Sequence, residues 1–303
     1  MSRAVTLGML LVLGAAIAVA QDTEQATPQR PANAVERASQ RPTEADVYCA
    51  GYFSRNRIEP AVIVMSSLDV GMKFELGTND LILLSKPKGS EPAMGSNYML
   101  VRPVRDINPK ESFHGQHEVI RRMGTLYAEI ARIQVQEALK DSVRARVFSA
   151  CQPVLAGDIA IPLNEKAIPP FQPVFLAGRF APSSGKATGV IGAIKDFQES
   201  AGKGDIAYVS LGTSQGLKAG TYLRIYRTSE SAGQELSQEI MRNYATDSSG
   251  ISVGRRLSAQ EIESLPHRVV GEMIILSAEE GSATGMISYS WEEVSPGDLV
   301  EIE

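Results

Sequence analysis

Two stretches of this sequence align with each other without a gap, and this internal repeat limits the possible folds more than any other feature. The first covers residues 80–102 and the second covers residues 205–227. Each begins with an Asp, has a Gly fifteen residues later and ends with an Arg twenty-two residues after the Asp. Self-similarity of this kind indicates that one structural unit occurs twice.

The two copies also end alike. Each reaches a glycine that is expected to open an apolar strand, Gly124 in the first copy and Gly271 in the second. Each then closes on the pattern Val-x-x-Gly-Asp followed by an apolar residue, with Gly157-Asp158 in one copy and Gly297-Asp298 in the other. The sequence therefore predicts two modules, module 1 at residues 47–163 and module 2 at residues 186–303.

Within both modules, short apolar runs are bounded by Gly, Pro, Asn or Asp, which is typical of small all-β domains. Residues 206–211 and 222–226 are the clearest predicted strands. Glycines between such runs supply the positive φ of tight turns, and an Asp after them caps a turn with its carboxylate. The expected turn residues are Gly157, Asp158, Gly216, Gly220, Gly297 and Asp298.

One helix is predicted in module 2, because Ser258-Ala-Gln-Glu261 forms a capping box and Pro266 would end the helix after about two turns. The expected fold class is mainly all-β, with two tandem small β-barrel or β-sandwich modules and short helical excursions.

Module 2 carries a family resemblance in the patterns GDIAYVSLGTSQGLKAGTYLRIYR (204–227), VVGEMIILSAEEGSATGMIS (269–288) and VSPGDLVEIE (294–303). These patterns resemble the small β-domain at the C-terminus of flagellar assembly protein T. They are also similar to β-repeats that follow LysM domains in secreted envelope proteins, and VYCAGYFS (47–54) looks like the entry strand of those repeats. The resemblance implies an envelope-associated module without catalysis. No LysM module is found ahead of the repeats.

The N-terminus predicts export. Arg3, an uncharged run and the small-x-small pattern at Ala18-Val19-Ala20 are typical of a signal peptide, residues 1–20, cleaved after Ala20. Residues 21–46 are polar and Pro-containing, which predicts a disordered tether. A Pro-rich linker is expected at 164–185. No later run suits a membrane span, so the expected location is the periplasm or the outside of the cell.

The two cysteines, Cys49 and Cys151, are expected to form a disulfide, because exported chains enter an oxidising compartment. Two buried unpaired thiols are the alternative. The formal net charge of −5, without a Lys/Arg cluster, gives no electrostatic basis for binding nucleic acid.

Residues that suggest chemistry are few. His114 and His117 could place two imidazoles near a metal ion, but a zinc site normally needs three or four protein ligands, so a solvated loop is the alternative and no cofactor is predicted. Ser183-x-x-Lys186 has the nucleophile spacing of penicillin-recognising enzymes but lacks their partner motifs. Asp158 and Asp298 recur like paired catalytic acids, yet turn capping explains them.

A binding role is the remaining hypothesis. Aromatic side chains stack on sugar rings or on a protein partner, and the candidate surface is Tyr222, Tyr226, Tyr289 and Trp291. Tyr222 and Tyr226 share strand parity and are expected on one side of the strand. Burial of that side in the core is the alternative. The sequence thus predicts a non-enzymatic envelope protein that binds a protein or a cell-wall polysaccharide such as peptidoglycan. A secreted hydrolase and a structural subunit of a surface assembly are the alternatives.

Overall fold

The computed structural model describes residues 41–67, 75–87, 89, 91–105, 110–172, 179–228 and 267–303. The expected signal peptide (1–20), residues 21–40 of the expected tether, part of the expected linker (173–178) and the helix expected from Ser258 lie outside the described residues. Within these ranges, no helix combines the length and the apolar character that crossing a membrane requires.

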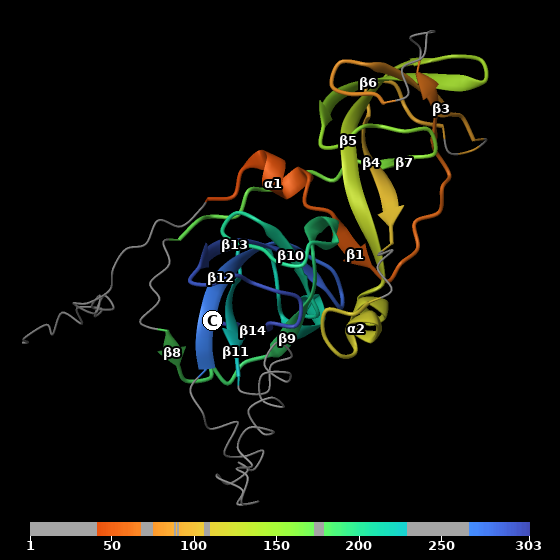
Figure 1. Ribbon diagram of the computed structural model, residues 1–303. Coiled ribbons are helices and arrows are strands. Elements are labelled where there is room, and N and C mark those ends of the chain that lie inside the picture. Colours follow the sequence, from red (N-terminus) through yellow and green to blue (C-terminus); the bar gives the residue numbers. More distant parts are fainter. Residues whose placement is uncertain are drawn as a thin grey trace, which may run out of the picture. The chain divides into compact units, whose positions relative to one another are not determined.

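Module 1 contains a sheet that follows the order β2-β3-β6-β5-β4-β7, with antiparallel neighbours (Figure 1). Residues of β3 and most of β6 alternate between buried and more exposed positions, as half-buried strands require. The strands are β2 (Val64–Ser67), β3 (Leu81–Ser85), β4 (Asn97–Val104), β5 (Thr125–Ala138), β6 (Ser142–Ala150) and β7 (Ile159–Pro162).

Module 2 repeats that order as β9-β10-β13-β12-β11-β14, and β14 pairs with β9, so the sheet closes into a six-strand barrel. A short strand, β8 (Phe180–Ala181), adds to β12 outside the barrel. The barrel strands are β9 (Thr188–Ile194), β10 (Ile206–Val209), β11 (Tyr222–Arg227), β12 (His267–Ala278), β13 (Ala283–Ser290) and β14 (Leu299–Ile302). Two short 3-10 helices, η1 (Lys195–Phe197) and η2 (Thr213–Gln215), follow β9 and β10.

The shared strand order confirms the predicted all-β fold of two tandem modules, but one part of the sequence alignment was wrong. Gly271 lies inside β12 and pairs with Ile225 of β11. The residue of module 1 equivalent to Ile225 is Leu100, and its partner on β5 is Ala131. Gly124 ends a helix and directly precedes β5, so it does open a strand, as predicted. The two glycines are therefore not at equivalent strand positions.

The recurring Arg and Asp of the repeat bind each other. Arg102 Nε donates to Asp158 Oδ1 at 2.7 Å, and Arg227 Nη2 donates to Asp298 Oδ2 at 2.8 Å. Each carboxylate also accepts a turn N–H at 2.8 Å, from Leu155 and from Ser295. Both aspartates are buried, so these charge-assisted bonds satisfy a group that would be costly to bury alone.

The predicted turn glycines have the positive φ that was expected of them. All four have φ between 84° and 97°, a region that other residues rarely adopt. They are Gly157, Gly216, Gly220 and Gly297.

A segment that we call the strap, residues 43–54, joins the two modules. Thr43 caps the helix α1 (Glu44–Tyr48), which begins before the end of the predicted tether. β1 (Tyr52–Ser54) then pairs with the start of β5 in module 1. On its other side, backbone carbonyls of the strap accept hydroxyl groups of module 2: Tyr208 donates to Ala50 at 2.7 Å, Thr284 to Gly51 at 2.9 Å and Ser282 to Phe53 at 3.0 Å.

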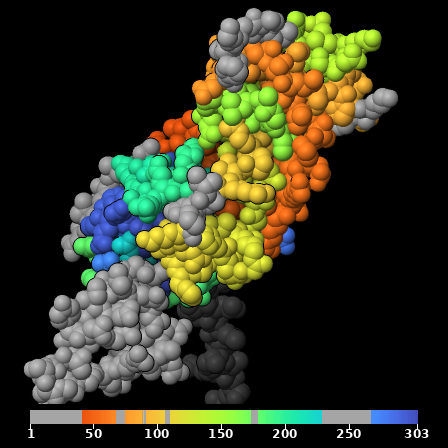
Figure 2. All heavy atoms as spheres, turned by 45° about the vertical axis from the view of Figure 1, so that its right-hand side comes forward, coloured from red at the N-terminus to blue at the C-terminus, as the bar shows by residue number. Residues whose placement is uncertain are grey.

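Helix α2 (Gln116–Met123) makes a second connection between the modules (Figure 2). Gln116 is buried, and its Nε2 donates to the carbonyl of Gly192 in β9 at 3.0 Å. Val119 and Met123 lie one helical turn apart and are buried against the same strand. Together the strap and α2 hold a mixed hydrophobic cluster, in which Phe53, Leu126 and Tyr127 of module 1 pack with Tyr208 and Met286 of module 2.

The predicted disulfide is confirmed, since Cys49 and Cys151 are bonded with a Cα–Cα distance of 5.5 Å. It ties the strap, just after α1, to the residue that follows β6.

Reduction of this disulfide is expected to lower the free energy of unfolding by about 2–4 kcal/mol, because it closes a loop of 102 residues in the unfolded chain. Urea unfolding with and without reductant measures the change. A Cys49→Ala/Cys151→Ala variant serves as the control and should not respond to reductant. Equal stability of the oxidised and reduced proteins would contradict the structural role.

Substitution Gly192→Val is expected to lower the free energy of unfolding by about 1–3 kcal/mol, because its Cβ would lie 2.8 Å from Met123 Sδ and 3.2 Å from Val119 Cγ1. In a Met123→Ala background the loss should be smaller, since the helix then has room for the side chain. Gly202→Val is the matched control, because a Cβ there meets no atom within 4 Å.

Candidate functional site

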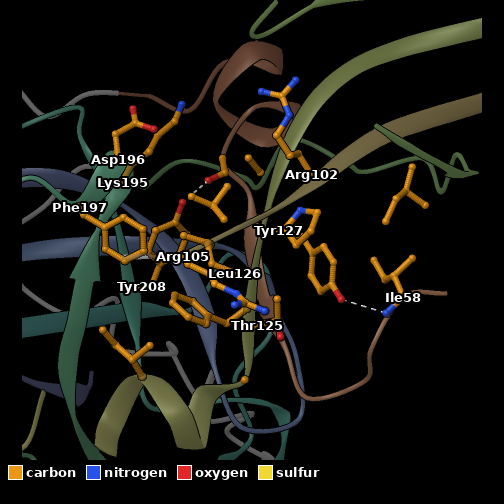
Figure 3. A pocket seen from close by; sticks show the side chains of 18 of the residues that line it. Ile58, Arg102, Arg105, Thr125, Leu126, Tyr127, Lys195, Asp196, Phe197 and Tyr208 are labelled. Atoms are coloured by element: carbon orange, nitrogen blue, oxygen red, sulfur yellow. Dashed lines mark hydrogen bonds between the residues drawn. The ribbon is translucent and has the colours of Figure 1, made fainter. Parts of the chain in front are cut away.

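A cleft of about 1230 Å³ lies between the strap, β4, β5, α2 and η1 (Figure 3). We call it the junction cleft. In Figure 3, Lys195, Asp196 and Phe197 lie on one side of it, and Tyr127 and Ile58 lie on the other. Residues from both modules therefore contribute to a single hollow.

Two buried tyrosines fix the wall of the cleft. The hydroxyl of Tyr127 accepts the backbone N–H of Ile58 at 2.9 Å, and the hydroxyl of Tyr208 donates to the strap at Ala50. Phe53 packs edge-on against Tyr208 with ring centroids 5.3 Å apart. Burial raises the pKa of Tyr208 well above its usual value, with smaller contributions from Asp196 and Glu129, so its hydroxyl stays protonated and remains a donor.

Basic side chains dominate the polar lining. Arg57, Arg105 and Lys195 border the cleft. None of these three has an ion-pair partner within the part of the chain that the structure describes. Two further cleft arginines are already paired, Arg102 with Asp158 and Arg121 with Glu118. The acidic residue of the lining is Asp196. The cleft is therefore positively charged in a chain of net charge −5.

The sequence did not predict these cleft residues. Arg57 follows β1, Arg105 follows β4 and Lys195 begins η1, so no local pattern links them. Only the packing of α2 and the strap against module 2 brings them to one place.

The four predicted aromatics do not form one exposed surface. Tyr222 and Tyr226 do lie on the same side of β11, away from the buried Leu223 and Ile225, but Tyr226 is only 4% exposed. It stacks on His267 with ring centroids 3.9 Å apart. Burial and the nearby Glu301 carboxylate raise its pKa to about 12.

The other three predicted aromatics, Tyr222, Tyr289 and Trp291, contact other parts of the chain or each other. The Tyr222 hydroxyl accepts the N–H of Gln172 at 2.7 Å, which attaches the linker to β11. Tyr289 and Trp291 contact each other edge-on at 5.7 Å near the end of β13, and Arg179 lies over the Trp291 ring.

Ser183 is part of a polar cluster in which a carboxylate, not an imidazole, faces its hydroxyl. Ser183 Oγ lies 3.4 Å from Glu301 Oε2, and His267 Nδ1 lies 3.4 Å from Glu301 Oε1. A serine nucleophile is normally activated by a base such as histidine at hydrogen-bond distance, with the carboxylate behind the histidine. Here Glu301 lies between the two groups. Although burial opposes ionisation, the Ser184 N–H, His267 and Arg224 hold the Glu301 pKa below its usual value.

His114 and His117 do not converge on a metal site. The carboxylate of Glu111 accepts the backbone N–H groups of His117 at 2.8 Å and Gly115 at 3.1 Å, and it lies 3.3 Å from His117 Nδ1. These backbone bonds lower the Glu111 pKa. Across the described ranges, no group of three or more His, Cys, Asp or Glu side chains is arranged to hold a metal ion.

The sequence matches no model of a protein family, and no curated protein is detectably similar to it.

The outer side of the second barrel also holds a buried carboxyl group, Glu272, which is 3% exposed. Ser288 Oγ donates to its Oε1 at 3.1 Å. Burial, together with the neighbouring Glu303 carboxylate, raises the Glu272 pKa from its ordinary 4.5 to about 8. The folded protein therefore holds a proton near neutral pH that the unfolded chain releases.

This shift predicts a pH-dependent stability. The contribution of protonated Glu272 is fully present below pH 4.5 and is lost as the pH rises toward 8. Glu272→Gln should therefore raise the free energy of unfolding at pH 8 by at least about 1 kcal/mol and change it little at pH 4. Urea unfolding at both pH values measures this, with Glu137→Gln on the exposed end of β5 as the control. A gain of equal size at both pH values would contradict the assignment.

Proposed function

We propose that this chain is an exported, non-enzymatic protein of the cell envelope that binds a partner in the junction cleft. The observation that carries the proposal is the cleft itself, a hollow of about 1230 Å³ assembled from both modules and lined by three basic groups that have no ion-pair partner among the described residues. The features of residues 1–20 support export, and the Cys49–Cys151 disulfide is compatible with an oxidising compartment.

A protein partner is favoured over a neutral polysaccharide. Sugar binding commonly uses exposed aromatic rings as stacking platforms. Of the expected aromatic set, Tyr226 is buried and the Tyr222 hydroxyl is bonded to the linker. Charged groups around an apolar floor, in contrast, suit a protein surface.

A structural subunit that polymerises by strand addition is less favoured. Strand addition requires a free sheet edge. β14 pairs with β9 in module 2, and an isolated bridge between Ile63 and Ile159 connects β7 to the start of β2 in module 1.

Site-specific crosslinking in intact cells tests the proposal. A photoreactive benzoyl-phenylalanine in place of Phe197, in the cleft, should form an adduct with a partner. The same group in place of Phe148, which is 39% exposed on β6 and outside the cleft lining, is the matched control and should not. Absence of an adduct from position 197, or equal adducts from both positions, would overturn the proposal.

Export has its own test. The N-terminus of the protein recovered from the periplasm or the medium should be Gln21. Recovery of the chain only in the cytoplasm with residues 1–20 intact would contradict it.

A further inference from the structure

We propose that the junction cleft binds an acidic peptide segment of a partner protein, with its carboxylates paired to Arg57, Arg105 and Lys195 and an apolar side chain placed against Phe197. This inference rests on the proposed binding function and names the chemistry of the partner.

Charge complementarity is the first argument. The chain has 35 acidic and 30 basic residues, so a hollow with an excess of positive charge is not the average surface of this protein. Arg57 and Arg105 are exposed, and Lys195 is half-buried. Basic groups that meet around a cleft attract anionic ligands and speed their association.

The floor of the cleft gives the second argument, because it is apolar where the rim is charged. Ile58, Val104, Leu126 and Phe197 line it and also pack against the cluster that holds the modules together. A small inorganic anion would use the rim alone. A peptide that alternates acidic and apolar side chains would use both.

The backbone at Asp196 and Phe197 is the third argument. Both residues have positive φ, 57° and 52°, although neither is glycine. Such conformations are strained and persist where the surrounding structure holds them, often at ligand sites. Here they place the ring of Phe197 in the cleft beside Lys195 (Figure 3).

Side chains, and not strand addition, would make the contacts. β7 pairs with β4 only at residues 98–101, whereas β4 continues beside β5 to Val104. Pro103 lies in that continuation and has no N–H to offer to an added strand. Recognition therefore falls to the guanidinium and ammonium groups at the rim, with bidentate Arg–carboxylate pairs as the strongest contacts.

Fluorescence anisotropy with the full-length mature protein tests this inference. The probe is a short labelled peptide that alternates Glu with Leu, and its matched control alternates Gln with Leu. The Glu peptide should bind, and rising salt should weaken its binding because the rim contacts are screened. The variant Arg105→Glu/Lys195→Glu should weaken it at least about tenfold.

The control variant Arg146→Glu/Lys218→Glu makes the same charge changes at exposed positions outside the cleft lining, and its affinity should stay within about twofold of the original. Three results would overturn the inference: no binding of the Glu peptide, equal binding of the Gln peptide, or equal losses in both variants. Sedimentation with purified peptidoglycan that depends on Arg105 and Lys195 would also overturn it. A crosslinked partner at position 197 without binding of the acidic peptide would refute this inference alone and leave the proposed function standing.

Discussion

The backbone of the strap is the element on which the rest of the structure depends. One edge of β1 pairs with β5 in module 1, and on the other side hydroxyl groups of Tyr208, Ser282 and Thr284 in module 2 bind its carbonyls. Gly51 is required at this point, because a Cβ would lie 2.9 Å from the Tyr127 carbonyl oxygen and its φ is +72°. With the strap in place, α2 packs on β9 and the junction cleft takes its form.

The two modules share their strand order and an Arg–Asp pair, and they contribute different elements to the region where they meet. The same Arg–Asp pair occurs in both, where it links a strand to the closing turn. The elements that join the modules, α1 with β1 and α2, come from module 1. Two similar scaffolds thus share one hollow, which these segments of module 1 help to form.

Much of this fold was predictable from sequence, because strand patterns and turn glycines are local signals. The internal repeat predicted two similar modules, and the expected export to an oxidising compartment predicted the Cys49–Cys151 disulfide. Helix α2 was not predicted, although Val119 and Met123, four residues apart, mark a buried helical face. The cleft was not predictable. Arg57, Arg105 and Lys195 are far apart in the chain, and only tertiary packing gives them a common role.

The position of the disulfide has a consequence for the order of assembly. Cys49 and Cys151 both precede the first residue of module 2 in the chain, so the disulfide can fix the strap to the first module without any residue of the second. The second barrel then packs against a strap that is already ordered. Its three hydroxyl groups hydrogen-bond to carbonyls whose positions are already fixed, which lowers the entropic cost of association. In a chain synthesised from its N-terminus, module 1 with its strap would fold first and provide the surface on which module 2 packs.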